Sequence, residues 1–237
     1  MLAILLIPAS AWAYRPFVST DAAVADPKEV EIELGYFSLE RTRRENTITT
    51  SSVVLNYGFA KNWEAVGEFR VEDSRAFEIT DPGLFLKGVL KEGVLQGKQG
   101  VSFAIEAGPL LPSTLPHEHG VGVEAIGIVS GKVAPVTVHL NGGGGLDRDG
   151  RHAFAIWGVI GELPVHPKLR LVGEVNGEST QDQHPNNSAL LGVIWQPTSK
   201  NVFLDAGVRR GISRAAPDWQ FTIGLTFGFS LPGLSRQ

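Results

Sequence analysis

Residues 219–229 read Trp-Gln-Phe-Thr-Ile-Gly-Leu-Thr-Phe-Gly-Phe. Every second side chain from Phe221 to Phe229 is large and apolar, whereas the side chains between them are Thr and Gly. Strict alternation with a period of two is typical of a β-strand, because successive side chains of a strand point to opposite faces. The stretch therefore predicts a strand with one aromatic-rich face and one small, polar face.

Two settings give a strand such a pattern. In a soluble sandwich the polar face more often carries Lys and Glu, whereas in a transmembrane barrel the apolar face meets lipid and the small polar face meets the lumen. The stretch also resembles the C-terminal insertion signal of bacterial outer-membrane barrels, on Thr222, Gly224, Phe227 and Phe229. The resemblance implies recognition by the barrel-assembly machinery. It departs from the signal in the tail Ser230–Gln237, since such barrels often stop at the aromatic residue.

The N-terminus predicts export. An apolar run, Leu2–Ile7, is followed by Ala11-Trp12-Ala13, a small-x-small triplet of the kind that signal peptidase cuts after. We predict a signal peptide over 1–13, cleaved after Ala13, although no Lys or Arg precedes the run. The alternatives are a short membrane anchor or a buried helix, but a span needs about 20 apolar residues. Since no other segment approaches a membrane helix, a membrane location would require a closed barrel, which satisfies every backbone group in lipid.

Composition narrows the class of protein. The chain has 237 residues, 28 Gly, no Cys and a formal net charge of −4. Without Cys an exported protein has no disulfides, so its stability must come from a sheet or a core. The mean hydropathy of +0.03 is low for a helical membrane protein, and the pI of about 5.9 argues against a nucleic-acid partner. The length suits one domain.

Alternating segments recur along the whole chain, and most have the length of about ten residues that crosses a bilayer as a tilted strand. Short turns alternate with longer polar loops such as Asp73–Asp81, with one exception at Glu92–Lys98. We therefore predict an all-β fold, a closed antiparallel transmembrane β-barrel of about 12 strands, with short periplasmic turns and longer extracellular loops. The predicted strands are 29–40, 47–59, 63–73, 82–91, 99–110, 120–130, 134–142, 151–162, 168–177, 188–197, 201–210 and 219–229.

The same alternation predicts which side chains face the lumen. The lumen-facing candidates are Glu31, Glu33, Glu64, Glu68, Arg70, Lys87, Glu106, Glu124, Arg170, Glu174, Asp205 and Arg209. We also expect Lys91 to face inward, and we leave strands 151–162 and 188–197 unoriented because they alternate poorly. Inward charges either pair across neighbouring strands and fill the lumen, or form a channel wall that selects solutes by charge. For the hairpin of strands 63–73 and 82–91 we predict a Glu–Lys ladder with Lys87 in it.

Several stretches resemble one family. Residues 15–22, Arg-Pro-Phe-Val-Ser-Thr-Asp-Ala, and the Glu-rich strand at 28–36 look like the opening of the MetA-pathway phenol-degradation group of Gram-negative outer-membrane proteins, also described as transporters. Asp81-Pro82-Gly83 and the close at 224–229 are similar to later motifs of that group. The resemblance implies an outer-membrane barrel and uptake of aromatic compounds, and it defines no binding residues.

The sequence carries no convincing catalytic, cofactor or metal motif. His117-Glu118-His119 lacks a third metal ligand at a recognisable spacing, and no His precedes a Ser by two residues, as it does in known outer-membrane lipases. We therefore predict a barrel that is not an enzyme and that passes small, hydrophobic or aromatic molecules. Its predicted parts are a periplasmic segment over 14–27, a barrel over 28–230 and a tail over 231–237. Two interpretations of the segment stay open, a plug that folds into the mouth of the barrel and a disordered leader.

Two other functions remain open. The first is a non-transporting envelope-structural or adhesion barrel, and the second is a soluble exported β-sandwich whose aromatic face is its core. The predicted partners are outer-membrane lipid, the barrel-assembly machinery during insertion and a small-molecule solute, with no nucleic acid. Need for detergent separates the barrels from the sandwich, and solute flux separates the two barrels.

Overall fold

The computed structural model describes residues 16–41, 46–73, 77–115, 118–148, 152–197 and 201–231. The predicted signal peptide over 1–13 lies outside the described residues, as do residues 14–15 of the predicted periplasmic segment. The predicted tail is described only at Leu231. No helix within the described ranges is long and apolar enough to cross a membrane.

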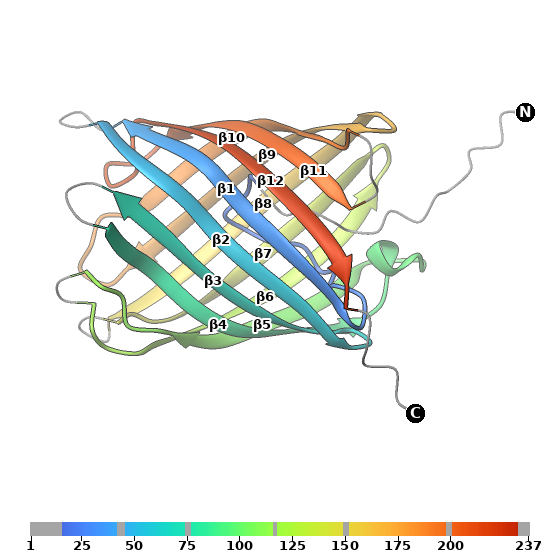
Figure 1. Ribbon diagram of the computed structural model, residues 1–237, viewed down its shortest axis with the longest axis horizontal. Coiled ribbons are helices and arrows are strands. Elements are labelled where there is room, and N and C mark those ends of the chain that lie inside the picture. Colours follow the sequence, from blue (N-terminus) through green and yellow to red (C-terminus); the bar gives the residue numbers. More distant parts are fainter. Residues whose placement is uncertain are drawn as a thin grey trace, which may run out of the picture.

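The described chain forms one closed antiparallel barrel of twelve strands, which confirms the predicted fold class (Figure 1). Each strand pairs with its neighbours in sequence, and β1 closes the ring against β12. The strands are β1 Glu29–Arg41, β2 Asn46–Ala60, β3 Trp63–Asp73, β4 Phe77–Lys91, β5 Ser102–Leu110, β6 Gly122–Val133, β7 Val136–Leu146, β8 Ala153–His166, β9 Leu169–Thr180, β10 Asn186–Trp195, β11 Val202–Gly211 and β12 Trp219–Ser230.

The alternation in β12 separates an apolar outside from a tightly packed inside. Phe221 and Ile223 are 44% and 53% exposed on the outer surface, whereas Thr222 and Thr226 are 8% and 0% exposed. A similar division holds in β4, where Leu84 and Leu86 are exposed and Lys87 is buried. The period-two pattern thus separates an apolar outer wall from an inner wall of small, polar and charged groups.

The two strands that the sequence left unoriented have apolar inner faces. In β8, Ile160 is fully buried while Trp157 and Val159 are exposed. In β10, Leu190 and Ile194 are buried and Leu191 is exposed. Because both faces carry large apolar side chains, hydrophobicity alone does not alternate in these strands. Their inner faces pack against other residues inside the barrel, as described below.

Two sequence expectations around β4 are wrong. Residues 77–81, expected to belong to a loop, continue the strand, with Thr80 opposite Arg70. A register shift between Glu68 and Arg70 and a φ of 50° at Asp81 accommodate this extension, so the Asp-Pro sequence lies within a strand and not at its start. Lys91, expected to face inward, is exposed beside a second register shift that follows Val89.

The connections at the two rims differ in length. Turns at 61–62, 134–135 and 167–168 lie at the rim that also holds the start of β1 and the end of β12, at the right in Figure 1. Longer connections at 111–121, 147–152 and 212–218 lie at the opposite rim. The exception predicted at Glu92–Lys98 belongs to the connection 92–101, which is long at the rim of short turns and carries the short helix η1, Val94–Gln96.

Candidate functional site

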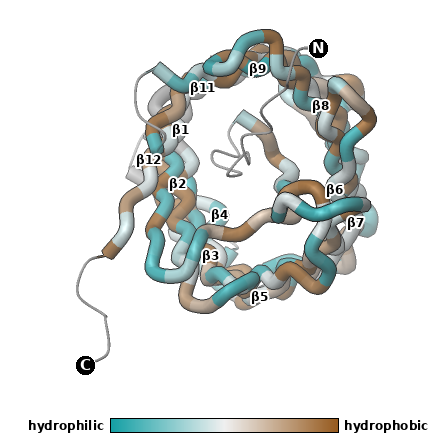
Figure 2. Tube along the Cα trace, turned by 90° about the vertical axis from the view of Figure 1, so that its right-hand side faces the viewer, coloured by the Kyte–Doolittle hydropathy of each residue, from teal (hydrophilic) through white to brown (hydrophobic). Residues whose placement is uncertain are grey.

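The N-terminal segment, residues 16–27, lies inside the ring of strands (Figure 2). It enters from the rim that holds the start of β1. There the backbone N–H of Lys28, a residue with a φ of 72°, donates to Gly58 O at 2.6 Å, and Leu231 N donates to Lys28 O at 2.9 Å. The segment is therefore tied to the closing strands at one end and crosses the lumen from there.

Polar side chains of the inner wall hold the backbone of the N-terminal segment. On the β3 side, Ala25 N donates to Glu64 Oε2 at 2.7 Å. Near the middle of the segment, Thr20 and Asn141 of β7 form a reciprocal pair, in which Thr20 N donates to Oδ1 at 3.1 Å and Nδ2 donates to Thr20 O at 2.8 Å. Asn141 therefore binds the backbone as another strand would.

At its other end the N-terminal segment reaches β9. Ser19 N donates to Glu174 Oε1 at 2.8 Å, and Val18 N lies 3.2 Å from both carboxylate oxygens of Glu174. The Glu174 carboxylate also pairs with the Arg209 guanidinium of β11, which in turn donates to Ser188 Oγ at 2.9 Å. A wall ion pair thus presents its acceptor oxygens to the segment.

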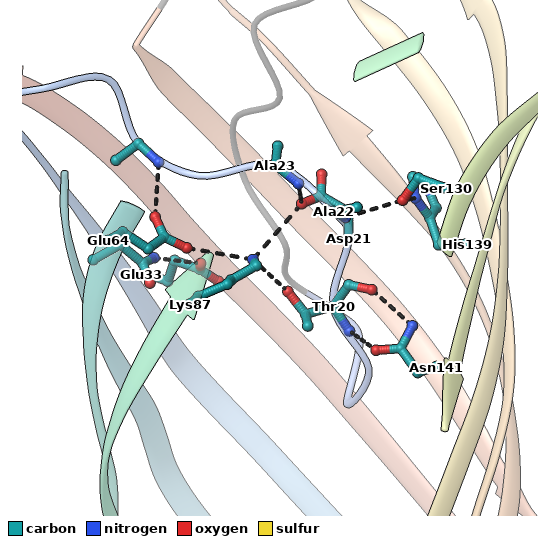
Figure 3. A network of polar contacts seen from close by, with 12 residues as sticks. Thr20, Asp21, Ala22, Ala23, Glu33, Glu64, Lys87, Ser130, His139 and Asn141 are labelled. Atoms are coloured by element: carbon teal, nitrogen blue, oxygen red, sulfur yellow. Dashed lines mark hydrogen bonds and ion pairs between the residues drawn. The ribbon is translucent and has the colours of Figure 1, made fainter. Parts of the chain in front are cut away.

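Lys87 forms a buried charge cluster with the N-terminal segment (Figure 3). Its Nζ lies 3.3 Å from Glu64 Oε1 and 3.8 Å from Asp21 Oδ1, and it donates to Thr20 Oγ1 at 3.1 Å. Of the predicted Glu–Lys ladder, the pair of Glu64 with Lys87 is present, since the two residues lie directly opposite each other in β3 and β4, whereas Lys91 is exposed. The sequence did not indicate the third charge, Asp21, because it comes from outside the sheet.

A second network lies under Ala22. Ala22 N donates to Ser130 Oγ at 2.9 Å, and Ser130 Oγ lies 2.8 Å from His139 Nδ1 (Figure 3). His139 Nε2 lies 3.4 Å from Glu162 Oε1, and Arg170 donates to Glu162 Oε2 at 2.8 Å. Ser, His and Glu are the residue types of a hydrolytic triad. Here Ser130 is fully buried and its oxygen is taken by the Ala22 amide, so the network anchors the segment.

The irregular connection at 92–101 also contacts the N-terminal segment. Gln96, at the end of η1, donates its Nε2 to Ala22 O at 2.8 Å, while its Oε1 accepts from Ser102 Oγ at 2.7 Å. At the start of the connection, Glu92 accepts from Lys98 and from Asn62 Nδ2. Chiefly because of the Lys98 contact, the pKa of Glu92 falls from 4.5 to about 2. The extra length of this connection thus places the side-chain amide of Gln96 against the backbone of the N-terminal segment.

Apolar and small residues shape the wall around the first residues of the N-terminal segment. The ring of Phe17 packs against a cluster of buried side chains from β9, β10 and β11, namely Val172, Leu190, Ile194 and Phe203. A Cβ on Gly158 would lie 1.8 Å from Ser19 Oγ, and one on Gly192 or Gly207 would lie 3.3 Å from Pro16 Cγ. Glycine in these strands therefore leaves the space that the segment fills.

A cavity of about 690 Å³ remains inside the barrel beside the N-terminal segment. Its lining carries more acidic than basic side chains and includes the aromatic residues Phe17 and Phe154. Nine of the predicted lumen-facing residues line it: Glu31, Glu33, Glu64, Glu68, Arg70, Lys87, Glu106, Glu124 and Arg209. The other three, Arg170, Glu174 and Asp205, are not part of this lining; Glu174 and Asp205 are buried, whereas Arg170 is partly exposed over the Phe203 ring.

Arg148 makes a set of contacts at the opposite rim that the sequence did not indicate. It donates Nε to Leu111 O at 2.7 Å and Nη2 to Pro82 O at 2.8 Å, and its Nη1 lies 3.5 Å from Asp81 Oδ1. One side chain in the β7–β8 connection therefore joins the β5–β6 connection to β4. These contacts join residues far apart in sequence, so no local pattern marks them.

No protein-family model and no curated protein matches the chain. Among solved structures, the fold is similar to that of the COG4313 outer membrane channel from Pseudomonas putida F1, with a TM-score of 0.60 and 10% identity over 87% of this chain and 97% of that chain. The in-vitro folded trimer form of OmpT, an outer membrane protein of Vibrio cholerae, gives a TM-score of 0.43, 11% identity and coverage of 86% and 100%. At such identities the likeness concerns the fold alone.

Proposed function

We propose that this protein is an outer-membrane channel for small molecules, in which the N-terminal segment plugs the lumen. The observation that carries the proposal is a closed barrel whose interior holds both a cavity of about 690 Å³ and a separate stretch of chain. The segment is not a strand of the barrel, and wall side chains hold it. Its departure would leave the sheet intact and open the cavity toward the rim where the chain enters.

The outer wall supports a membrane location. Exposed Leu, Val, Ile and aromatic side chains face outward along the strands, for example Leu84, Leu191 and Ile223. A water-soluble monomer rarely exposes so large an apolar surface, whereas a barrel in lipid requires it. Outer-membrane lipid as a partner, insertion by the barrel-assembly machinery through Phe227 and Phe229, and export by the predicted signal peptide belong to this proposal.

The resemblance to the phenol-degradation group extends the proposal to aromatic solutes. Phe154, whose ring packs against buried side chains of the inner wall and lines the cavity, would stack against an aromatic ring. Adhesion is the weaker alternative, because even the longer connections at the rim opposite the chain termini, such as 111–121, are short for an adhesin, and strand extensions such as 77–81 occupy part of that rim.

The test compares two glycine variants in the full chain. Gly158→Val places a side chain where Ser19 lies, so the N-terminal segment must move, whereas a Cβ on Gly142 meets nothing within 4 Å. We expect Gly158→Val to raise single-channel conductance and sugar flux into liposomes, and Gly142→Ala to match the wild type. Both variants must first show the heat-shifted band of a folded barrel. An assembled Gly158→Val barrel that passes no more solute than wild type would refute the plug.

A further inference from the structure

The inner wall recognises the main chain of the N-terminal segment. Wall side chains accept hydrogen bonds from the backbone N–H groups of Val18, Ser19, Thr20, Ala22 and Ala25. Asn141 of the wall donates to the carbonyl of Thr20, and Gln96 of η1 donates to the carbonyl of Ala22. Any peptide that follows the same course through the lumen offers these groups. The binding of this stretch therefore depends little on its particular sequence.

The wall specifies few of the side chains of the N-terminal segment. Ser19, Ala22, Ala23 and Ala25 are small, and the wall leaves room for a small residue at Gly158. One larger side chain is specified, because Phe17 packs on the apolar cluster of β9–β11. One charge is specified, because Asp21 lies beside Lys87. The wall thus fits an aromatic residue followed by a run of small residues.

The binding groups of the wall have partners of their own. Glu174 is paired with Arg209, Glu64 with Lys87, and Ser130 with His139. These partners keep the acceptors oriented and compensate their charge when the N-terminal segment is absent. The site is therefore organised before a ligand enters, which lowers the entropy lost on binding.

We propose that the lumen is a binding site for short peptides that carry an aromatic residue followed by small residues, and that residues 16–27 occupy this site in the closed channel. The proposal rests on the proposed function, since the N-terminal segment must leave before another peptide binds. The solute class is short peptides, and the N-terminal segment is the model for how such a peptide binds. A peptide supplies the same backbone donors and acceptors, and its aromatic side chain takes the place of Phe17.

The experiment uses the full chain with its own N-terminal segment weakened and the wall intact. Ala22→Pro removes the amide that binds Ser130, because proline has no N–H. The probe is a fluorescein-labelled peptide that begins with Phe and continues with Ala and Ser over the length of residues 17–25. We expect saturable binding by fluorescence anisotropy in detergent, and block of the Ala22→Pro conductance at the same peptide concentrations.

Two controls separate main-chain recognition from simple trapping in a pore. An N-methylated peptide of the same sequence lacks the donors and is expected to bind at least about tenfold more weakly. In the Ala22→Pro background, Asn141→Leu removes the reciprocal pair and is expected to weaken peptide binding about tenfold. Asn56→Leu is the matched variant, because Asn56 also lines the cavity but binds Glu33. It is expected to leave peptide binding unchanged.

The outcomes distinguish the two proposals. If Ala22→Pro conducts more than wild type but the peptide does not bind, or binds as its N-methylated form does, the peptide site is refuted and the plugged channel stands. Equal effects of Asn141→Leu and Asn56→Leu also refute the site. If the assembled Ala22→Pro barrel conducts no more than wild type, the plug is refuted and the peptide proposal falls with it.

Discussion

Lys87→Met tests the charge cluster that holds the N-terminal segment. The Lys87 side chain is buried, and its Nζ lies 3.3 Å from Glu64 and 3.8 Å from Asp21. Methionine keeps much of the length of the side chain but removes the charge. Two buried carboxylates then face each other without a cation, and Thr20 Oγ1 loses its donor.

The magnitude follows from the burial of the cluster. Removing one partner of a buried ion pair costs about 3–5 kcal/mol, because it leaves a buried charge uncompensated. The chain can avoid this cost if the N-terminal segment leaves the lumen and carries Asp21 into water. A loss of about 3 kcal/mol in the inserted state corresponds to a shift of about 100-fold toward the open state. Lys87→Met is therefore expected to open the channel more than it destabilises the barrel.

The assay is single-channel recording in planar bilayers, with the open fraction as the measured quantity. The heat-shifted band and urea unfolding in detergent, measured on the same preparations, show whether the barrel itself is assembled and stable. Lys132→Met is the control, since it removes an exposed charge at the end of β6. Lys87→Met with Asp21→Asn is expected to close the channel again in part. If Lys87→Met assembles and neither its open fraction nor its stability differs from wild type, the cluster does not hold the segment.

Three further variants test the rim, the loop and the last strand. The double variant Phe227→Ala, Phe229→Ala is expected to abolish the heat-shifted band in outer-membrane fractions, because it lacks the interfacial aromatics of the insertion signal. Wild-type amounts of the band would contradict this expectation. Arg148→Ala is expected to speed amide exchange at residues 111–115 about tenfold, because Leu111 O loses its donor. The stabilisation from the contacts of Glu92 is present above pH 4.5 and is lost as the pH falls through the lowered pKa of about 2. The variant Glu92→Gln is expected to lack this acid-dependent step. A carboxyl titration of Glu92 by NMR with a midpoint near 4.5 would refute the lowered pKa.

The strands could be predicted where the two walls differ in polarity. In β12 the outer face carries Phe and Ile and the inner face carries Thr and Gly, so a period of two is visible in the sequence. In β10 the inner face carries Leu190 and Ile194, which pack near Phe17 from outside the sheet. The alternation disappears there because an apolar inner wall is covered by a distant part of the chain. Local patterns cannot show that cover.

The lumen candidates were predicted as positions and not as partners. Glu64 and Lys87 lie opposite each other in one hairpin, so strand register is enough to predict their pair. Asp21 reaches Lys87, and Asn141 and Glu174 bind the backbone of the N-terminal segment, only because residues 16–27 turn inward at Lys28. The sequence predicts a loop that ends at Asp81 and a strand that begins at Pro82, whereas a positive φ at Asp81 lets 77–81 continue within β4.

The arrangement of charges explains how a segment so well bound could leave the lumen. Glu174 and Glu64 keep Arg209 and Lys87 as partners after the N-terminal segment departs, so the wall retains its two buried ion pairs. The segment itself takes away the charge of Asp21, which water solvates. What holds the segment is then chiefly a set of backbone hydrogen bonds, each worth about 0.5–1.5 kcal/mol net, and the burial of Phe17. Under the proposed peptide site, a solute that supplies both takes the place of the segment, whereas a solute without amide groups forms none of these backbone hydrogen bonds with the wall.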